Sequence, residues 1–216
     1  SYNWYEIFVY SYQDSNGDGI GDFNGVRKRL DYIADMGYTG IWFMPIMPSP
    51  SYHKYDVTDY KAVDPQYGTM DDFRALVKEC HEKGIRVIID LPVNHTSTRH
   101  PWFLSAVESI QKRTCDSPYM DYYCFTQAPT GNKYVKVSGS DWHYEEQFAG
   151  GNMPDLNLHN EAVLAELKDM ESFSMVNDDM RLQDCTFLSE LPNLKELSIF
   201  TGDEPDLSLL ETMLQL

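Results

Sequence analysis

The sequence predicts an α/β fold built around a parallel sheet or a (β/α) barrel. Three stretches have the composition of buried strands: residues 5–12 (YEIFVYSY), 40–46 (GIWFMPI) and 86–93 (RVIIDLPV). Two amphipathic stretches alternate with them, at residues 24–37 and 70–84. Because parallel neighbouring strands need crossover helices, the β-α-β-α-β order favours a parallel sheet.

Both predicted helices carry apolar residues at helical spacing and have recognisable ends. In the first, Val26, Leu30 and Ile33 recur three or four residues apart, and Gly37 supplies the stop. In the second, acidic residues occupy the first turn, where they complement the helix dipole, and Gly84 follows the last turn. These signals place one helix between each pair of consecutive strands.

Residues 96–154 interrupt the alternation and predict an insertion after the third strand. They are rich in Tyr, Ser, Gly and Thr and contain one short helical stretch, residues 101–112. So long an irregular segment after a strand is more typical of an active-site excursion than of a plain connection. Residues 155–170 (DLNLHNEAVLAELKDM) then predict a turn followed by a helix.

The charge of the chain is strongly negative and excludes some classes of partner. The 216 residues include 34 acidic and 17 basic side chains, for a net charge of −17. Such a surface repels phosphate backbones, so we expect no nucleic-acid partner, and it suits cation binding. No apolar run reaches the roughly 18 residues of a membrane span. The first residues lack the basic start and apolar stretch of a signal peptide.

The four cysteines do not predict a zinc ribbon, because none of them forms a CxxC pair. Cys115 and Cys124 are close enough in sequence to close a small loop. They are therefore a candidate disulfide in an oxidising compartment, with two free thiols as the alternative.

The composition changes near residue 173, which indicates a boundary. All 4 Trp and all 15 Tyr precede residue 171, whereas residues 171–216 contain ten acidic and two basic side chains. In this tail, apolar residues recur with the spacing of a leucine-rich repeat at Leu188, Leu191, Leu194, Leu197 and Ile199. One repeat and a partial second cannot bury their own apolar face, so an ordinary amphipathic segment is the alternative.

The sharpest local signal is a loop with oxygen-bearing side chains at alternate positions and glycines between them. The candidate ligands are the side chains of Asp14, Asn16, Asp18 and Asp22, with the carbonyl of Ile20. Such a loop can wrap a hard cation such as calcium. It is not an EF-hand, because the twelfth position is Gly25 instead of Glu and a strand precedes it. The alternative is a solvated turn.

A second signal follows the third predicted strand, in Asp90-Leu-Pro-Val-Asn94-His95. Polar residues at the carboxyl end of a barrel strand line the mouth where barrel enzymes place their sites. Strand alternation sends only some of them inward, so they are not equivalent. His95 can donate to a sugar hydroxyl, and the alternative is that Asn94 and His95 merely cap a loop.

Taken together, five segments resemble the α-amylase superfamily, glycoside hydrolase family 13. They are DSNGDGIGDFNG, GIWFMPIMPSPSYHKYDVTDY, DPQYGTMDDF, RVIIDLPVNHTS and MPDLNL, in that order. DLPVNH resembles the first signature region of the family. MPDLNL resembles the fifth, in the form found in amylases intermediate between the α-amylase and oligo-1,6-glucosidase groups. The resemblance covers residues 4–173 and implies a partial (β/α)8 TIM barrel, its first three strands, with an inserted domain B and an unrelated acidic, Leu-rich tail.

The resemblance implies roles for several residues. Tyr55 corresponds to the aromatic residue that stacks on the sugar beside the cleaved bond. His95 corresponds to the histidine that contacts that sugar, and Asp90 to the carboxylate that braces the site. Asn94 and Asp155 correspond to ligands of one calcium site in many α-amylases. Another calcium site, found in part of the family, corresponds to the loop residues Asp14, Asn16, Asp18, Ile20 and Asp22.

The residues that would cleave the bond are not identifiable. Retaining glycosidases use two carboxylates about 5–5.5 Å apart. In this family the nucleophile is an Asp after an Arg on the fourth strand, but residues 180–183 read MRLQ, so Gln183 stands at that position. An amide cannot perform the attack, and Asp184 follows one residue later, where a strand side chain points to the opposite face. No acid/base Glu and no third carboxylate after an Asn-His pair follow.

These observations divide the chain into four parts: residues 1–95 (first β/α units), 96–154 (domain B), 155–173 (return segment and third barrel helix) and 174–216 (tail). The leading hypothesis is an α-amylase-like hydrolase of α-glucosidic bonds in starch or maltooligosaccharides, with calcium as cofactor. We expect it to be truncated or fused, inactive alone, and extracellular or on the cell surface with its signal removed. The alternatives are a non-catalytic calcium- and carbohydrate-binding protein and a leucine-rich-repeat interaction protein.

Overall fold

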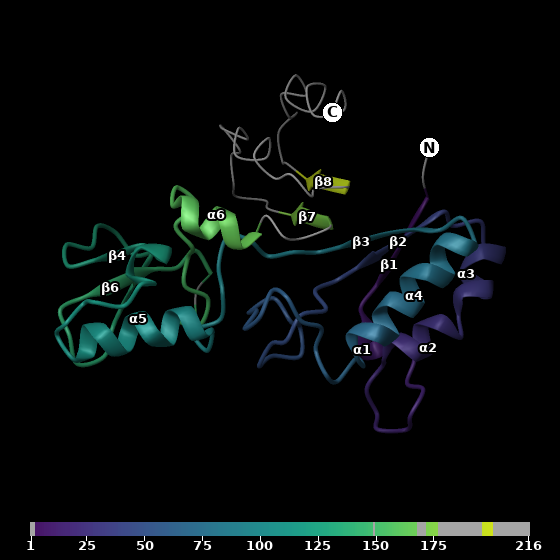
Figure 1. Cartoon of the computed structure of the whole chain (residues 1–216), viewed down its shortest axis with the longest axis horizontal. Helices are drawn as coiled ribbons and strands as arrows, with labels where there is room; N and C mark the ends of the chain where they lie inside the picture. Colours follow the sequence, from purple (N-terminus) through teal and green to yellow (C-terminus); the bar gives the residue numbers. More distant parts are fainter. Residues whose placement is uncertain (1–2, 149, 168–171, 177–195, 201–216) are drawn as a thin grey trace, which may run out of the picture.

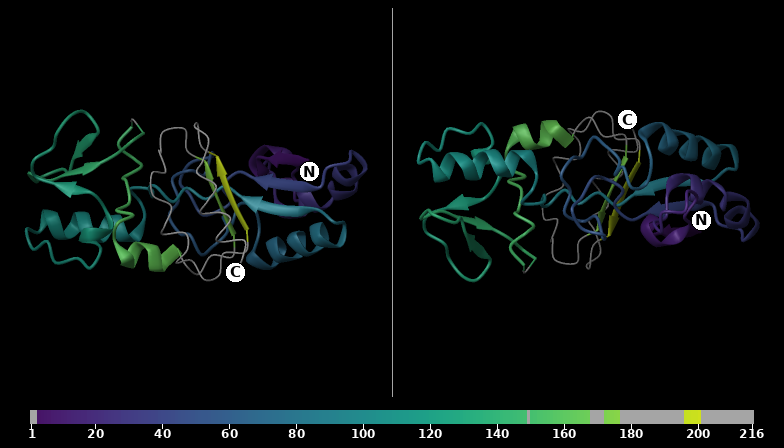
Figure 2. Two further views of the ribbon diagram at one scale, coloured as in Figure 1. Left: turned by 90° about the horizontal axis from the view of Figure 1, so that it is seen from above. Right: turned by 90° about the horizontal axis from the view of Figure 1, so that it is seen from below.

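The structure, a computed structural model, describes residues 3–148, 150–167, 172–176 and 196–200 (Figure 1). A unit built on a parallel sheet and a unit built on a small antiparallel sheet lie at opposite ends of the long axis (Figures 1 and 2). Within the described ranges no helix is long and apolar enough to cross a membrane.

The first unit contains the predicted parallel sheet. Its strands are hydrogen-bonded in chain order: β1 (Trp4–Ile7), β2 (Gly40–Phe43) and β3 (Arg86–Ile89). Ile7 lies opposite Phe43, and Phe43 lies opposite Ile89. This register aligns the carboxyl ends of all three strands along one edge. Residues that directly follow the strands therefore meet there, as in other parallel α/β folds.

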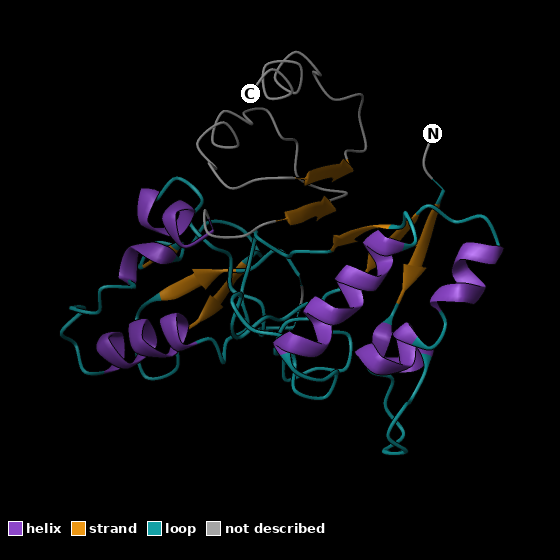
Figure 3. Cartoon of the chain, turned by 45° about the vertical axis from the view of Figure 1, so that its right-hand side comes forward, coloured by secondary structure: helices purple, strands orange, loops and turns teal. Residues whose placement is uncertain are grey.

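Helices pack beside this sheet (Figure 3): α1 (Val9–Tyr12), α2 (Phe23–Arg27), α3 (Leu30–Asp35) and α4 (Met70–Glu82). Helix α4 matches the second predicted helix. It begins at a capping box in which Thr69 Oγ1 accepts from the backbone N–H of Asp72 and the Asp72 carboxylate accepts from that of Thr69.

Two predicted boundaries in this unit were wrong. The strand predicted for residues 5–12 ends at Ile7, because residues 9–12 turn into α1. That turn packs closely against Gly21, where a Cβ atom would lie 1.9 Å from the Val9 carbonyl oxygen. The helix predicted for residues 24–37 is two helices, because Arg29 (φ −106°, ψ 0°) leaves the helical conformation.

The insertion has more regular structure than the sequence indicated. Its elements are α5 (Pro101–Gln111), η1 (Met120–Tyr122), β4 (Phe125–Thr126), β5 (Tyr134–Lys136) and β6 (His143–Glu145). The strands form an antiparallel sheet in the order β4-β6-β5. Phe103 of α5 packs edge-on against Tyr123 and Tyr144, which gives the insertion an aromatic core. Helix α6 (Glu161–Leu167) follows, as predicted.

Two short strands come from the last part of the chain. β7 (Ser172–Val176) and β8 (Glu196–Phe200) pair in parallel, with Ser172 opposite Glu196. β7 lies near β3 (Figure 1). Leu197 and Ile199 of the proposed repeat belong to β8, whereas Leu188, Leu191 and Leu194 lie outside the described residues. The interpretation of this tail as a leucine-rich repeat therefore stays a prediction.

The candidate disulfide is not formed, because Cys115 and Cys124 both carry free thiols. Cys115 is exposed in the turn that follows α5. Cys124 is half-buried beside β4, where burial first and the nearby Glu145 second raise its pKa to about 11. Their different surroundings explain why closeness in sequence did not bring the two thiols together.

Candidate active site

The candidate site is centred on Asp90, the residue that directly follows β3. Its carboxylate accepts two hydrogen bonds, from Trp42 Nε1 to Oδ1 (2.7 Å) and from the Tyr55 hydroxyl to Oδ2 (2.9 Å). Trp42 belongs to β2, and Tyr55 lies on the long connection between β2 and α4. The Asp90 carboxylate thus links the end of β3 to β2 and to the connection that follows β2.

Burial makes this carboxylate hard to ionise. Loss of solvent raises the pKa of Asp90, while the hydrogen bonds from Trp42 and Tyr55 lower it and the charge of Glu6 raises it further. Both oxygens already accept a hydrogen bond from a protein donor. The arrangement suits a carboxylate that holds its neighbours in place and not one that attacks a substrate.

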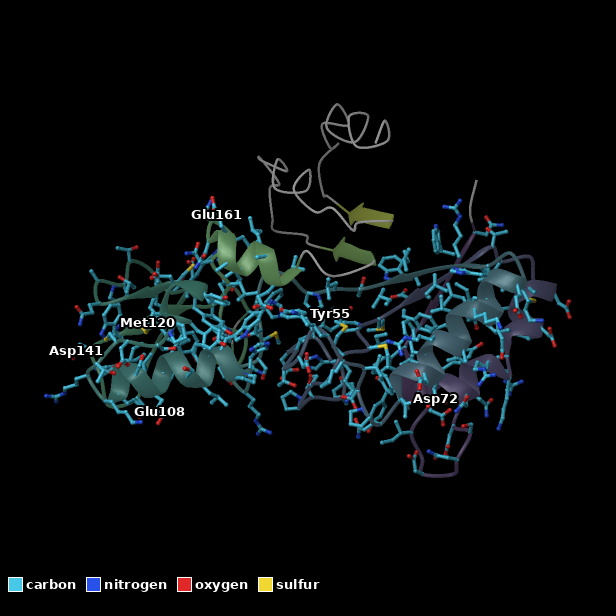
Figure 4. The ribbon with its side chains drawn as sticks, viewed as in Figure 1. Tyr55, Asp72, Glu108, Met120, Asp141 and Glu161 are labelled. Atoms are coloured by element: carbon cyan, nitrogen blue, oxygen red, sulfur yellow. The ribbon has the colours of Figure 1, made fainter. Side chains whose placement is uncertain are left out.

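Tyr55 is held at both ends, by its hydroxyl and by its backbone. Burial and the adjacent Asp90 charge raise the pKa of the phenol well above its usual value, so the hydroxyl stays protonated and donates. Its carbonyl oxygen lies 3.0 Å from Nε2 of His95. In Figure 4, Tyr55 lies in the middle of the molecule, between the two units.

The contacts of His95 define a single neutral tautomer. Nε2 donates to the Tyr55 carbonyl, and Nδ1 accepts from the Asn94 amide at 2.6 Å. Burial lowers the pKa of His95, which favours this neutral form. The ring meets Phe148 edge-on, with centroids 5.2 Å apart. The structure therefore brings Tyr55, Asp90 and His95 together, and His95 holds the Tyr55 backbone. Sugar contact by His95 stays a prediction.

A second cluster joins the end of β3 to the start of the return segment. The backbone N–H of Leu156 donates to the Asn94 carbonyl (2.9 Å), and His95 and Asp155 form a β-bridge. This pairing brings Asn94 and Asp155 close, although calcium binding by them stays a prediction. Asp155 is 8% exposed, and burial raises its pKa to about 6, aided by the charges of Glu145 and Glu146.

Glu146 is a member of this cluster that sequence reasoning missed. It is 5% exposed, and its Oε1 accepts from the backbone N–H groups of Gly151 (2.8 Å) and Asn152 (3.3 Å). Its Oε2 is buried without a hydrogen-bond partner among the described residues. A buried carboxylate oxygen without a donor is costly and is the kind of atom that a bound cation satisfies. In the sequence it stands in an irregular insertion, where nothing distinguishes it from other acidic residues.

The acidic loop between α1 and α2 forms a separate site at the end of the first unit (Figure 1). Asp14 accepts from the backbone N–H groups of Asn16, Gly17 and Gly19, and the bonds from Gly17 and Gly19 lower its pKa most. Asp18 accepts from Ile20. The hard oxygen donors suit calcium, but in this conformation these oxygens accept from the loop's own backbone.

Asp22 closes the loop and starts the next helix. Its Oδ2 accepts from Ser15 N–H (2.8 Å), and its Oδ1 accepts from Gly25 N–H (2.7 Å), which caps α2. Across the part of the chain that the structure describes, no three His, Cys, Asp or Glu side chains stand together as a metal-binding group. Calcium binding at this loop therefore stays a prediction. Gln183 and Asp184, which bear on the catalytic nucleophile, lie outside the described residues.

The comparison with protein families matches residues 6–204 to the α-amylase catalytic domain. The match covers most of the chain, and the chain therefore belongs to the α-amylase family, glycoside hydrolase family 13. It also extends into the tail, beyond residue 173, where we expected the resemblance to end.

Individual relatives agree with this assignment. Alpha-amylase 3 of Dictyoglomus thermophilum is 47% identical over 171 residues, which cover 79% of this chain and 33% of that protein. An oligo-1,6-glucosidase of Parageobacillus thermoglucosidasius is 35% identical over 206 residues, covering 89% of this chain and 36% of that protein. The chain thus spans about a third of the length of these curated relatives.

Solved structures confirm the fold class. Amy13B of Eubacterium rectale superposes with a TM-score of 0.75 at 49% identity, over 79% of this chain and 36% of that one. An α-amylase from H. orenii superposes with a TM-score of 0.78 at 37% identity, over 94% of this chain and 48% of that one. The three parallel strands and their helices are therefore part of an amylase-type (β/α) barrel.

The raised pKa of Asp155 predicts how stability depends on pH. The folded state binds this proton more tightly than the unfolded state, in which an Asp side chain has its ordinary pKa of about 3.8. The contribution of Asp155 is therefore fully present below about pH 4 and is lost as pH rises through about 6. We predict that the wild-type chain loses stability between these values relative to Asp155→Asn, which does not titrate.

Denaturant unfolding from pH 4 to pH 7 in the presence of a chelator measures this difference. Asp141→Asn, which changes an exposed carboxylate of the insertion, is the control and should run parallel to the wild type. Parallel profiles for wild type and Asp155→Asn would contradict the prediction.

Proposed function

We propose that this chain carries the sugar-binding wall of a retaining hydrolase that acts on α-glucosidic bonds of starch or maltooligosaccharides. The observation that carries the proposal is the Trp42–Asp90–Tyr55 group at the carboxyl edge of the parallel sheet, in a chain that belongs to the α-amylase family. Relatives named α-amylase and glucan 1,6-α-glucosidase support an α-glucoside as the substrate. Tyr55 offers an aromatic ring to a sugar, and Asp90 fixes the orientation of that ring.

The residues of this wall bind and orient a sugar but do not break its bond. Retaining cleavage needs a nucleophilic carboxylate and an acid/base carboxylate about 5–5.5 Å apart. Asp90 accepts hydrogen bonds at both oxygens, and Tyr55 stays protonated. Neither provides the nucleophile, and Gln183 stands where the family has its Asp. The 216-residue chain by itself therefore binds maltooligosaccharides without hydrolysing them.

We predict that Tyr55→Ala weakens maltotetraose binding by about tenfold or more, because it removes the stacking surface and the donor to Asp90. Tyr32→Ala is the matched control, because Tyr32 is an exposed tyrosine on α3 (51% exposed) and should leave binding unchanged. Isothermal titration calorimetry measures both variants. A folded wild-type chain that binds no maltotetraose, or binds it equally well as Tyr55→Ala, would reject the proposal.

Hydrolysis is tested separately, with a chromogenic maltooligosaccharide. We predict no turnover above the uncatalysed rate, since no nucleophile has been identified. Turnover that disappears in Asp184→Asn would show that the chain carries its own nucleophile and would contradict this part of the proposal. Binding without turnover would also suit the alternative, a non-catalytic carbohydrate-binding protein. For either role we propose an extracellular or cell-surface location.

We propose calcium as the cofactor at two places. In the loop, the donors would be the oxygens of Asp14, Asn16, Asp18 and Asp22 with the Ile20 carbonyl, once the carboxylates exchange backbone N–H groups for the ion. In the second cluster, the donors would be Asn94, Asp155 and Glu146, whose Oε2 has no hydrogen-bond partner within the described part of the chain. Bound calcium would fix the loop between α1 and α2 and neutralise the buried charge beside His95.

We predict that saturating calcium raises the unfolding temperature, because a ligand that prefers the folded state stabilises it. Asp14→Asn should remove the contribution of the loop, and Glu146→Gln should remove that of the second cluster. The exposed Asp141→Asn variant should retain the full shift. Differential scanning calorimetry with calcium and with a chelator gives the shifts. If calcium shifts the unfolding temperature of Asp14→Asn as much as that of the wild type, the loop does not bind calcium. If it shifts that of Glu146→Gln as much, the second cluster does not.

A further inference from the structure

The loop that presents Tyr55 contains a lysine in an unusual position. The side chain of Lys54 is 2% exposed, although lysine is almost never fully buried unless its charge is paired. Its Nζ lies 2.8 Å from Asp64 Oδ2 and donates to Gln66 Oε1 at 2.6 Å. It also lies 5.5 Å from the centroid of the Tyr67 ring, within cation–π range. All three partners come from one short stretch before α4.

That stretch is firmly anchored to the rest of the first unit. Asp64 N–H donates to the Ile46 carbonyl (2.7 Å), and the carboxylate of Asp64 also accepts from Ser49 N–H (3.2 Å). The Tyr67 carbonyl accepts from Phe23 N–H at 2.9 Å, and Tyr67 is 1% exposed. The side chain of Lys54 is therefore bound to a stretch that is itself hydrogen-bonded to the core of the first unit.

The backbone of Lys54 is strained. Its φ is +68°, in the left-handed region where a residue other than glycine costs about 1–2 kcal/mol. Glycine would adopt this conformation without that cost. The free-energy cost of this backbone conformation is offset if the lysine side chain makes a favourable contact. The buried ion pair with Asp64 is such a contact.

The strained residue directly precedes Tyr55. On its other side, His53 Nδ1 accepts from Tyr55 N–H at 3.1 Å, and the two rings lie 6.0 Å apart. The chain thus turns at Lys54, so that the side chain of Lys54 enters the core while Tyr55 reaches Asp90. The direction of the turn decides where the Tyr55 ring lies.

We propose that Lys54 is a positioning residue for carbohydrate binding: its buried ion pair with Asp64 holds the left-handed turn that sets the Tyr55 ring against Asp90. The proposal rests on the proposed function, because it assigns Lys54 to the same sugar-binding wall. Lys54 itself touches no sugar. Its effect on binding passes through Tyr55.

The test removes both charges together, because a lone buried Asp64 carboxylate would unfold the chain for an unrelated reason. Lys54→Met/Asp64→Asn replaces the pair with neutral groups of similar size. Lys54→Gly/Asp64→Asn also relieves the backbone strain and is the second variant. We expect both to unfold cooperatively and to bind maltotetraose at least about tenfold more weakly, since small misplacements of a binding group are costly.

Two controls separate positioning from general stability. Arg27→Met/Glu79→Gln removes an ion pair between α2 and α4 that lies away from Tyr55. It should lower the unfolding temperature and leave maltotetraose affinity unchanged. In a Tyr55→Ala background, the Lys54→Met/Asp64→Asn change should cost no further affinity, because its effect is carried by the missing ring. If Lys54 has a purely structural role, the losses of maltotetraose affinity caused by the two changes should add.

The outcomes are distinct. If the wild type and the Arg27→Met/Glu79→Gln control bind maltotetraose and the Lys54 variants bind it equally well, the inference fails and the proposed function stands. If the losses add in the Tyr55→Ala background, or if neither Lys54 variant unfolds cooperatively, Lys54 is a folding residue and the inference is overturned. If the folded wild type binds no maltotetraose, the proposed function fails, and the inference fails with it.

Discussion

The two hydrogen bonds that Asp90 accepts, from Trp42 and from Tyr55, hold the candidate site together. Asp90 directly follows β3, Trp42 belongs to the neighbouring strand β2, and Tyr55 comes from the loop between β2 and α4. Because the three strands are in register, these residues converge on one edge of the sheet. One buried carboxylate therefore fixes the positions of Trp42 and Tyr55 at this edge. Both of its oxygens accept a hydrogen bond, so it orients these side chains.

Buried charge surrounds this surface on both sides. On the side of the first unit, Lys54 and Asp64 neutralise each other within the core. On the side of the insertion, Glu146 and Asp155 are both buried, and burial, together with the charges of Glu145 and Glu146, raises the pKa of Asp155. The charges of Lys54 and Asp64 pair with each other, whereas Glu146 Oε2 in the second cluster has no donor among the residues that the structure describes. The difference explains why we assign a structural task to the first and a cation to the second.

The sequence predicted the order of the elements and, through the family resemblance, singled out Tyr55, Asp90 and His95 as candidate sugar-binding residues, because both depend on short motifs in the chain. The hydrogen bonds that join these residues come from the structure alone. The sequence did not predict that the first strand stops at Ile7. Residues 8–12 have strand composition, and only the close packing of Gly21 on the Val9 carbonyl shows that they turn. Local amino-acid composition does not reveal a contact between residues that are separated in the sequence.

Contacts between segments that are distant in sequence also explain why some site residues could not be identified from the sequence. The sequence pattern indicates only that Trp42 is an apolar residue of a buried strand. Its role in the site depends on its indole N–H, which donates to Asp90. Lys54 and Glu146 are charged residues, which are usually exposed, and only the fold buries them. For Cys115 and Cys124 the sequence left a disulfide and two free thiols open, and the structure shows free thiols.

We propose above that a carbohydrate binds against the Asp90-centred edge of the sheet. An NMR titration of the ¹⁵N-labelled chain with maltotetraose tests it most directly, with the indole signal of Trp42 assigned through Trp42→Phe. We predict that the Trp42 indole and the backbone amides of Tyr55 and His95 show the largest shift changes. Shift changes confined to α5 and β5 of the insertion, with the Trp42 indole unmoved, would contradict the account.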